Sequence, residues 1–240
     1  MKYYAYCVLK SWDGTTPSGM GIDGQKIQTL VVEDVVVIVS QFDGDIVPIT
    51  RANVLLHESV VRSALVQTTP LPFRFGTLVT DAGLRSFIHT RHKNLLSRLA
   101  AVQNCVEMSV KIIWQQLSED SVEPATSSED VGAGTAFLRS KHQELLGNSV
   151  LNEKANEIGS WLKSSLTGLV RQEFVQVEPR HKIVVAAAFL IEKAREYDFK
   201  HSVRELQKNR PELHFLTSGP WPPYTFANID LEFETHFGVS

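Results

Sequence analysis

The sequence Gly219-Pro220-Trp221-Pro222-Pro223-Tyr224-Thr225-Phe226 says more about this chain than any other stretch of its length. Its three prolines fix φ near about −65° and remove three backbone donors, which predicts an extended, polyproline-like ribbon. Trp221, Tyr224 and Phe226 add large apolar rings that a soluble monomer rarely leaves uncovered. We expect this Pro-aromatic stretch either to strap the end of the chain onto its own core or to recognise a partner. Burying one aromatic ring contributes about 1.5–3 kcal/mol, which favours the strap.

The composition is that of an ordinary globular protein, with 43% hydrophobic and 21% charged residues among 240. A net charge of −3 gives no broad basic surface, which argues against nucleic acid as the main partner. No window reaches the ~18 apolar residues of a membrane span, and no signal-like apolar stretch follows Met1. Cys7 and Cys105 lie far apart in the sequence and form no metal-type pair. These features predict a soluble, cytoplasmic protein without a membrane span.

An acidic stretch separates two halves of the sequence. Residues 117–134 contain five acidic residues, no basic residue and several small or helix-breaking residues. Such a stretch buries too little apolar surface to offset its ordering entropy, so we expect a linker. The predicted organisation is a first domain at 1–117, the acidic linker at 118–133 and a second domain at 134–240.

The first half alternates predicted strands and helices. Strands are expected at 2–10, 30–40, 71–75 and 106–114, and the second of these is alternatively a hairpin broken at Glu33-Asp34. Helices are expected after the N-caps Thr50 and Thr80.

Arg74 is the most interesting charge of the first half. The alternation in Leu71-Pro72-Phe73-Arg74-Phe75 places Phe73 and Phe75 on one face and Arg74 on the other. We expect Arg74 to be solvated or to bind a carboxylate, either that of Glu58 or Glu107 or that of a partner.

The second half begins with a candidate long helix at about 135–170, which Gly147, Asn148 and Gly159 could divide into two. Strands are expected at 172–178, 182–191 and 213–216, with a short helix capped by Asp198. The tail at 227–240 is a candidate for one more strand. Antiparallel strands with helices on one face predict an α+β fold in each half, for which ferredoxin-like sandwiches are the natural arrangement.

Tests for common catalytic motifs are mostly negative. Residues 19–24 match G-x-G-x-x-G, but a polar loop precedes them and a β-rich run follows, so they predict a flexible loop. His57-Glu58 resembles half of a zincin helix, yet Val61 occupies the place of the second histidine. Cys7 and Cys105 fall in strands that a ferredoxin-like sheet would make neighbours, although two buried thiols remain the simpler interpretation. We therefore predict no catalytic, cofactor-binding or metal-binding residues.

The Pro-aromatic stretch resembles a hallmark of the gas vesicle protein F/L family, accessory proteins of gas vesicle formation. Four further stretches agree with this family in order: Tyr3-Tyr4-Ala5-Tyr6, Gly21-Ile22-Asp23-Gly24, His57-Glu58 and Leu71-Pro72-Phe73-Arg74-Phe75-Gly76-Thr77. The resemblance implies two α+β domains, each a modified ferredoxin-like antiparallel sheet with covering helices, the second with long coiled-coil-like helices.

The resemblance also implies a function without catalysis. We expect an accessory or minor structural protein that binds the small hydrophobic shell protein, and other accessory proteins, in the cytoplasm at the nascent vesicle or its gas-facing side. Self-association through the long helix is compatible with this role. The alternative is a small-ligand-binding or enzymatic ferredoxin-like protein with a pocket near Arg74 and His57. The candidate partner-binding or structural residues are His57, Glu58, Phe73, Arg74, Phe75, Pro220, Trp221, Pro222, Pro223 and Tyr224.

Overall fold

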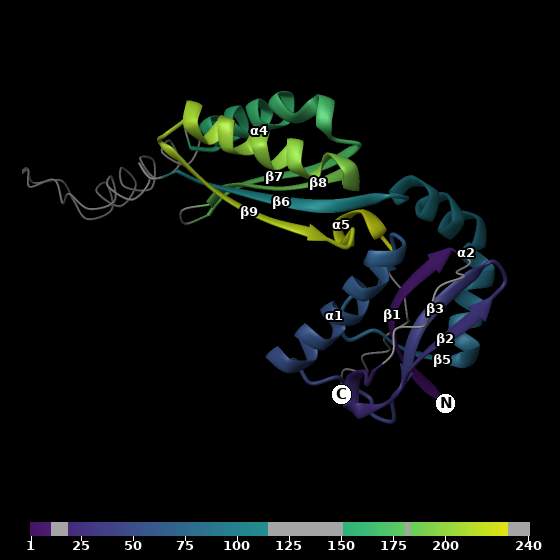
Figure 1. Cartoon of the computed structure of the whole chain (residues 1–240). Helices are drawn as coiled ribbons and strands as arrows, with labels where there is room; N and C mark the ends of the chain where they lie inside the picture. Colours follow the sequence, from purple (N-terminus) through teal and green to yellow (C-terminus); the bar gives the residue numbers. More distant parts are fainter. Residues whose placement is uncertain (11–18, 115–150, 181–182, 230–240) are drawn as a thin grey trace, which may run out of the picture. The chain divides into compact units, whose positions relative to one another are not determined.

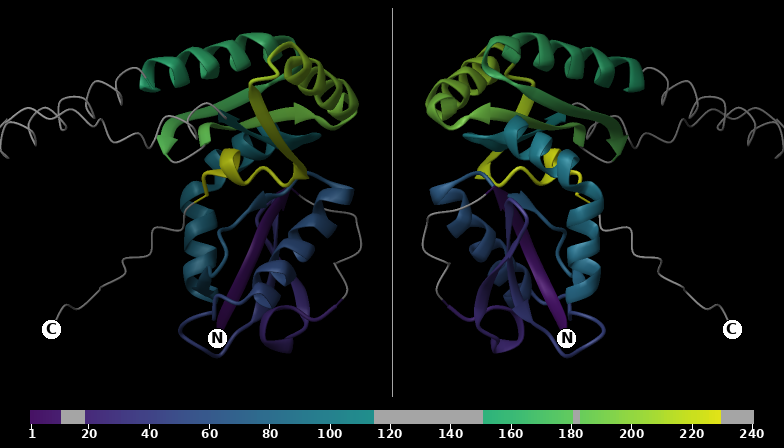
Figure 2. Two further views of the ribbon diagram at one scale, coloured as in Figure 1. Left: turned by 90° about the vertical axis from the view of Figure 1, so that its left-hand side faces the viewer. Right: turned by 90° about the vertical axis from the view of Figure 1, so that its right-hand side faces the viewer.

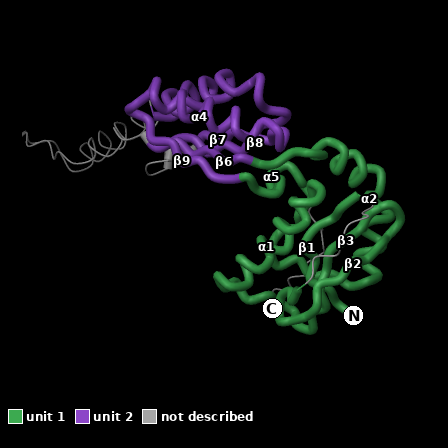
Figure 3. Tube along the Cα trace, in the orientation of Figure 1, with its two compact units in different colours: residues 1–107, 220–240 green, residues 108–219 purple. Residues whose placement is uncertain are grey.

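The structure is a computed structural model that describes residues 1–10, 19–114, 151–180 and 183–229. Within these ranges helices combine with strands in two sheets (Figure 1), so the predicted α+β class is confirmed. The chain divides into two compact units (Figure 3): Met1–Glu107 with the segment that starts at Pro220, and Met108–Gly219. No helix in the described part of the chain has the length and apolar character that a bilayer crossing requires.

The first unit is built on a five-stranded sheet with the order β2-β3-β1-β4, in which β5 also pairs with β1. The strands are β1 (Lys2–Lys10), β2 (Ile27–Val32), β3 (Val35–Gln41), β4 (Leu71–Pro72) and β5 (Leu78–Thr80). All their pairings are antiparallel. Strand β1 is central, and its residues 3–9 are all buried because both faces of the sheet are covered there. Glu33 has a φ of 54° in the turn between β2 and β3, so the hairpin alternative is confirmed.

Both helices of the first unit begin where the sequence predicts. Helix α1 (Arg51–Gln67) is capped by Thr50, whose hydroxyl accepts from Asn53 N at 3.1 Å. Helix α2 (Asp81–Val102) is capped in the same way by Thr80. Figure 2 shows both helices lying alongside the strands of this sheet. The buried residues of α2 form one apolar stripe along the helix: Leu84, Ile88, Leu95, Leu99 and Val102.

The second unit has a four-stranded sheet with the order β7-β8-β6-β9. Its strands are β6 (Cys105–Trp114), β7 (Gln172–Arg180), β8 (Ile183–Glu192) and β9 (Leu213–Trp221). Residues 151–166 are helical, and their inner stripe of Ala155, Ile158, Leu162 and Leu166 is fully buried. The helix passes through Gly159 without a break. Glycine suits this position because the helix lies close to the sheet there: a Cβ at Gly159 would stand 3.0 Å from Val177. The rest of the predicted long helix, including Gly147 and Asn148, lies outside the described residues.

The two units differ from the predicted domains. Strand β6 starts in the first unit and continues in the second, because its sheet neighbours β8 and β9 lie mainly in the second unit. The segment from Pro220 groups with the first unit, although its sequence position is in the second half. The predicted linker at 118–133 lies outside the described residues, as does the tail beyond residue 229.

Several predicted element boundaries are wrong. Strand β4 ends at Pro72, so Arg74 is not in a strand; the chain turns at Phe75-Gly76, where Gly76 has a φ of 87°. Strand β7 continues through Pro179, and helix α4 (Glu196–Asn209) begins before Asp198. The Pro-aromatic stretch is extended only through Pro223, because the Pro223 carbonyl then accepts from Phe226 N and Ala227 N and starts α5 (Tyr224–Ala227).

The simpler interpretation of the two cysteines, two buried thiols, is confirmed, whereas the sheet arrangement that would make their strands neighbours is wrong. Cys7 lies in β1 of the first sheet, whereas Cys105 lies in β6 of the second. Both are buried free thiols, and burial raises the pKa of Cys7. Cys7 therefore behaves as a small core residue.

Candidate functional site

The sequence stretches that carry the family resemblance meet inside the first unit, around His57. We call Tyr4, Tyr6, His57, Phe75 and Tyr224 the histidine–tyrosine cluster. The His57 ring stacks on Tyr6 with centroids 5.7 Å apart, and it meets Phe75 edge-on at 5.9 Å and Tyr224 at 6.3 Å. Tyr4 and Tyr6 are themselves in edge contact at 4.8 Å. Rings from β1, α1, the turn after β4 and α5 thus pack against one another.

A bulge in β1 helps to place these rings. The register passes from Ala5–Val39 to Cys7–Ile38, so Tyr6 is the extra residue on its strand. Such a bulge changes the direction of the side chain it carries. The Tyr6 hydroxyl accepts from Ile22 N at 2.8 Å and lies 3.1 Å from Ser40 Oγ.

His57 is a buried, neutral base in this cluster. Its Nδ1 lies 2.7 Å from the Tyr4 hydroxyl, and only 3% of the residue is exposed. Burial lowers the pKa of His57 to about 4, and the backbone of Phe73 opposes this shift. No hydrogen bond of normal geometry reaches the buried Nε2 from the described residues. Neutral His57 therefore acts as a hydrogen-bonding core residue at physiological pH.

The glycine-rich loop at 19–24 serves the same cluster. A Cβ at Gly21 would stand 2.2 Å from the Tyr6 hydroxyl and 2.9 Å from Ser40 Oγ, so only glycine fits. Asp23 and Gly24 follow with φ of 60° and 68°, which returns the chain to β2. The loop thus packs its backbone against a tyrosine hydroxyl, as a structural element.

The Pro-aromatic stretch is held onto the first unit by specific contacts. Thr225 donates to the buried Glu107 carboxylate twice, from N at 2.8 Å and from Oγ1 at 2.7 Å. Burial raises the pKa of Glu107, and the two Thr225 hydrogen bonds oppose that shift. The guanidinium of Arg62 lies 5.0 Å from the centre of the Trp221 ring. Pro222 and Pro223 are buried, so this part of the stretch is a strap.

The remaining predicted residues are not brought together. Phe73 is buried against Phe87 at 6.3 Å, while Arg74 is exposed and its carbonyl accepts from Thr77. Glu58, one expected mate of Arg74, pairs with Arg62. Arg74 lines a hollow of about 320 Å³ on the first unit, and the other lining residues are Pro72, Tyr224, Thr225, Ala227, Asn228 and Ile229. His57 does not line that hollow.

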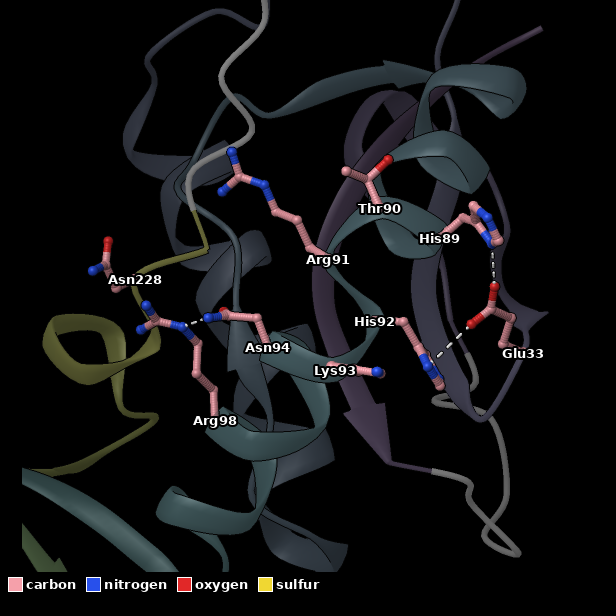
Figure 4. Close-up of a pocket in the computed structure, with 9 residues that line it drawn as sticks. All are labelled: Glu33, His89, Thr90, Arg91, His92, Lys93, Asn94, Arg98 and Asn228. Carbon is pink, nitrogen blue, oxygen red and sulfur yellow. Dashed lines mark hydrogen bonds and ion pairs between the residues drawn. The ribbon is translucent and has the colours of Figure 1, made fainter.

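A second hollow, of about 630 Å³, lies over α2 in the first unit (Figure 4). Its lining residues are Glu33, His89, Thr90, Arg91, His92, Lys93, Asn94, Arg98 and Asn228. His89 Nδ1 and His92 Nδ1 lie 2.7 and 3.2 Å from the two oxygens of Glu33. The sequence reasoning missed this hollow, although the signal was present: Arg91, Asn94 and Arg98 recur at i, i+3 and i+7 along one flank of the apolar stripe.

The fold and the cluster define a class of protein: a two-sheet α+β protein in which residues from distant parts of the sequence build a buried core and hold a C-terminal strap onto it. The architecture matches the crystal structure of a gas vesicle protein GvpF from Anabaena sp., with a TM-score of 0.78 and 22% identity over 98% of this chain and 99% of that one. Two curated relatives come from a Streptomyces species. Gas vesicle protein L is 25% identical over 94% of this chain and 92% of its own length. Gas vesicle protein F is 26% identical over 95% of this chain and 100% of its own.

Residues 2–228 match the family model described as gas vesicle synthesis protein GvpL/GvpF. The chain belongs to this family of proteins involved in gas vesicle formation.

Proposed function

We propose that this chain is an accessory protein that binds the small hydrophobic shell protein while gas vesicles form. Family membership over residues 2–228 is the observation that carries the proposal. A shell subunit with an apolar face aggregates unless a partner covers that face. The proposed place of action is the cytoplasm, at the nascent vesicle or its gas-facing side, with other accessory proteins as further partners.

The apolar side chains exposed on the first unit support a binding role. Ile46 and Ile49, in the segment before α1, are 83% and 87% exposed, and Leu55 in the second turn of α1 is 54% exposed. Three exposed large aliphatic side chains thus lie within ten residues of one another in the sequence, and water solvates such apolar surface poorly. We place the contact with the apolar shell protein at these side chains, which we call the Ile46–Leu55 patch.

The second unit offers a different kind of contact. Strand β7 is at one edge of the four-stranded sheet, and its Phe174 is 54% exposed. An edge strand has backbone donors and acceptors that an added strand can pair with. Strand addition at β7, with Phe174 as the apolar anchor, is the proposed second contact.

The candidate residues from the sequence have a supporting role in this proposal. His57, Phe75 and Tyr224 pack within the histidine–tyrosine cluster, and the strap holds α5 beside it. Among the described residues, His57 is not part of the lining of the hollow that Arg74 lines, and no observation favours the ligand-binding or enzymatic alternative. The ferredoxin-like description, the coiled-coil-like helix and self-association through it remain predictions.

Co-purification with the shell protein tests the proposal. The full chain is expected to retain the shell protein. Ile46→Ser with Ile49→Ser is expected to weaken binding by more than a hundredfold, because about 2 kcal/mol of apolar burial is lost per side chain. Val66→Ser is the matched control, since Val66 is an equally exposed aliphatic residue (81%) at the other end of α1. No association between the full chain and the shell protein under any condition would contradict the proposal.

A further inference from the structure

We infer that the hollow over α2 is a docking site for an acidic peptide segment of a protein partner. This inference goes beyond the proposed function, because the contact is electrostatic and does not involve the hydrophobic shell protein. The hollow has three permanent cations, those of Arg91, Lys93 and Arg98, in a protein whose net charge is −3. A local cationic hollow on an otherwise acidic protein attracts anionic segments.

The two sides of the hollow differ in their charge balance. On one side, the Glu33 carboxylate already lies between His89 and His92. Figure 4 shows Arg91, Asn94 and Arg98 extending to the other side, towards Asn228. There Arg98 donates to Asn94 Oδ1 at 2.7 Å and to the Ala227 carbonyl at 3.4 Å, both of which are neutral acceptors. Arg98 therefore keeps a charge with which a carboxylate can pair.

The spacing along α2 fits a peptide better than a compact anion. Arg91 and Arg98 are seven residues apart, which is about 10 Å along a helix axis. An extended peptide with acids at alternate positions presents carboxylates about 6.6 Å apart on one face. Two or three such carboxylates match the spacing of the two arginines, and a guanidinium binds a carboxylate with two parallel hydrogen bonds. A single phosphate would engage only one end of this row.

Neutral polar groups complete the site. Thr90, Asn94 and Asn228 line the same hollow, and their hydroxyl and amide groups can bond to the main chain of an extended peptide. Arg91 lies over the Phe87 ring with its guanidinium 5.4 Å from the ring centre, which restricts its side chain before binding. The described residues contain no trio of His, Cys, Asp or Glu arranged to hold a metal ion, so a metal does not compete as an occupant.

The test uses the full chain and a fluorescent, N-acetylated octapeptide with glutamate at alternate positions, titrated at low salt. We expect saturable binding, none with the matched glutamine peptide, and loss of affinity as salt is raised. Arg91→Gln with Arg98→Gln should weaken binding about tenfold, at a few-fold per exposed charge pair. Arg91→Lys with Arg98→Lys should keep part of the affinity for the glutamate peptide, because the positive charges remain. Arg85→Gln, compared with Arg98→Gln alone, removes an equal charge from the same helix outside the hollow and should leave binding unchanged.

Three results would overturn the inference. Equal binding by the wild-type chain and the double glutamine variant would place the peptide elsewhere. A loss of peptide affinity in Arg85→Gln equal to that in Arg98→Gln would show that binding depends on net charge alone. Tighter binding of a single-stranded oligonucleotide than of the glutamate peptide, at the same salt, would assign the hollow to nucleic acid instead. Circular dichroism of each variant separates loss of binding from loss of fold.

Discussion

Replacing His57 by asparagine should remove a defined part of the acid sensitivity of this protein. The pKa of His57 is about 4 in the folded chain, against an ordinary value of 6.5. Between these two values the unfolded chain binds a proton that the folded chain does not. The free energy of unfolding therefore falls as the pH drops from about 6.5 to about 4, and the contribution is fully present only above that window. A difference of about 2.5 pKa units corresponds to about 3 kcal/mol.

Asparagine is the suitable replacement because its amide reaches about as far as Nδ1 of the ring, the atom that meets the Tyr4 hydroxyl. The variant keeps a polar partner for Tyr4 but cannot take up a proton. We expect His57→Asn to be less stable than the wild type at pH 7. Between pH 7 and pH 4 the wild type should lose about 3 kcal/mol that the variant does not lose, so the difference in free energy of unfolding shrinks by that amount. His214→Asn, which removes an exposed histidine of β9, is the control.

Urea unfolding followed by near-ultraviolet circular dichroism at pH 7, 6, 5 and 4 measures the effect. Carboxylates shared by wild type and variant, including the buried Glu107, cancel in the difference between the two curves. The difference should narrow steadily between pH 6.5 and 4 for His57→Asn and stay flat for His214→Asn. Parallel curves for wild type and His57→Asn would refute the assignment of His57 as a buried neutral base.

Two further changes test the loop and the strap. Gly21→Ala would place a Cβ 2.2 Å from the Tyr6 hydroxyl and should destabilise the chain by about 1–3 kcal/mol in thermal unfolding. Gly168→Ala, which meets nothing within 4 Å, should be neutral, and equal effects of the two would refute the close packing. Thr225→Val should cost about 1–2 kcal/mol by removing a hydrogen bond to Glu107. In a Glu107→Gln background the Thr225→Val substitution should cost less. Full additivity of the two substitutions would refute an energetic coupling between Thr225 and Glu107.

Local chemistry made much of the fold predictable. Thr50 and Thr80 are side-chain caps whose hydroxyls bond three residues ahead, so both helix starts follow from a few neighbouring residues. Period-two alternation likewise placed β6. The strand predicted at 71–75 exists but ends at Pro72, because the turn at Gly76, with its positive φ, overrides the alternation before it.

The histidine–tyrosine cluster could not be predicted, because it depends on contacts between distant parts of the chain. Tyr4 and His57 are 53 residues apart, and their meeting requires the bulge at Tyr6 and the packing of α1 on β1. The hydrogen bonds between Thr225 and Glu107 join residues that are 118 positions apart in the sequence. The family resemblance pointed to the stretches that contain Tyr4, His57, Phe75 and Tyr224. The structure shows that these side chains pack in one cluster.

Site-specific photo-crosslinking in vesicle-forming cells tests the central claim, shell-protein binding, most directly. A photoreactive phenylalanine analogue replaces Ile46, Phe174 or, as the control, the exposed Lys208 of α4. We predict an adduct with the shell protein from the Ile46 and Phe174 positions and none from Lys208. Vesicles that form normally with no shell-protein adduct at either apolar position, or with equal adducts at all three, would contradict the account.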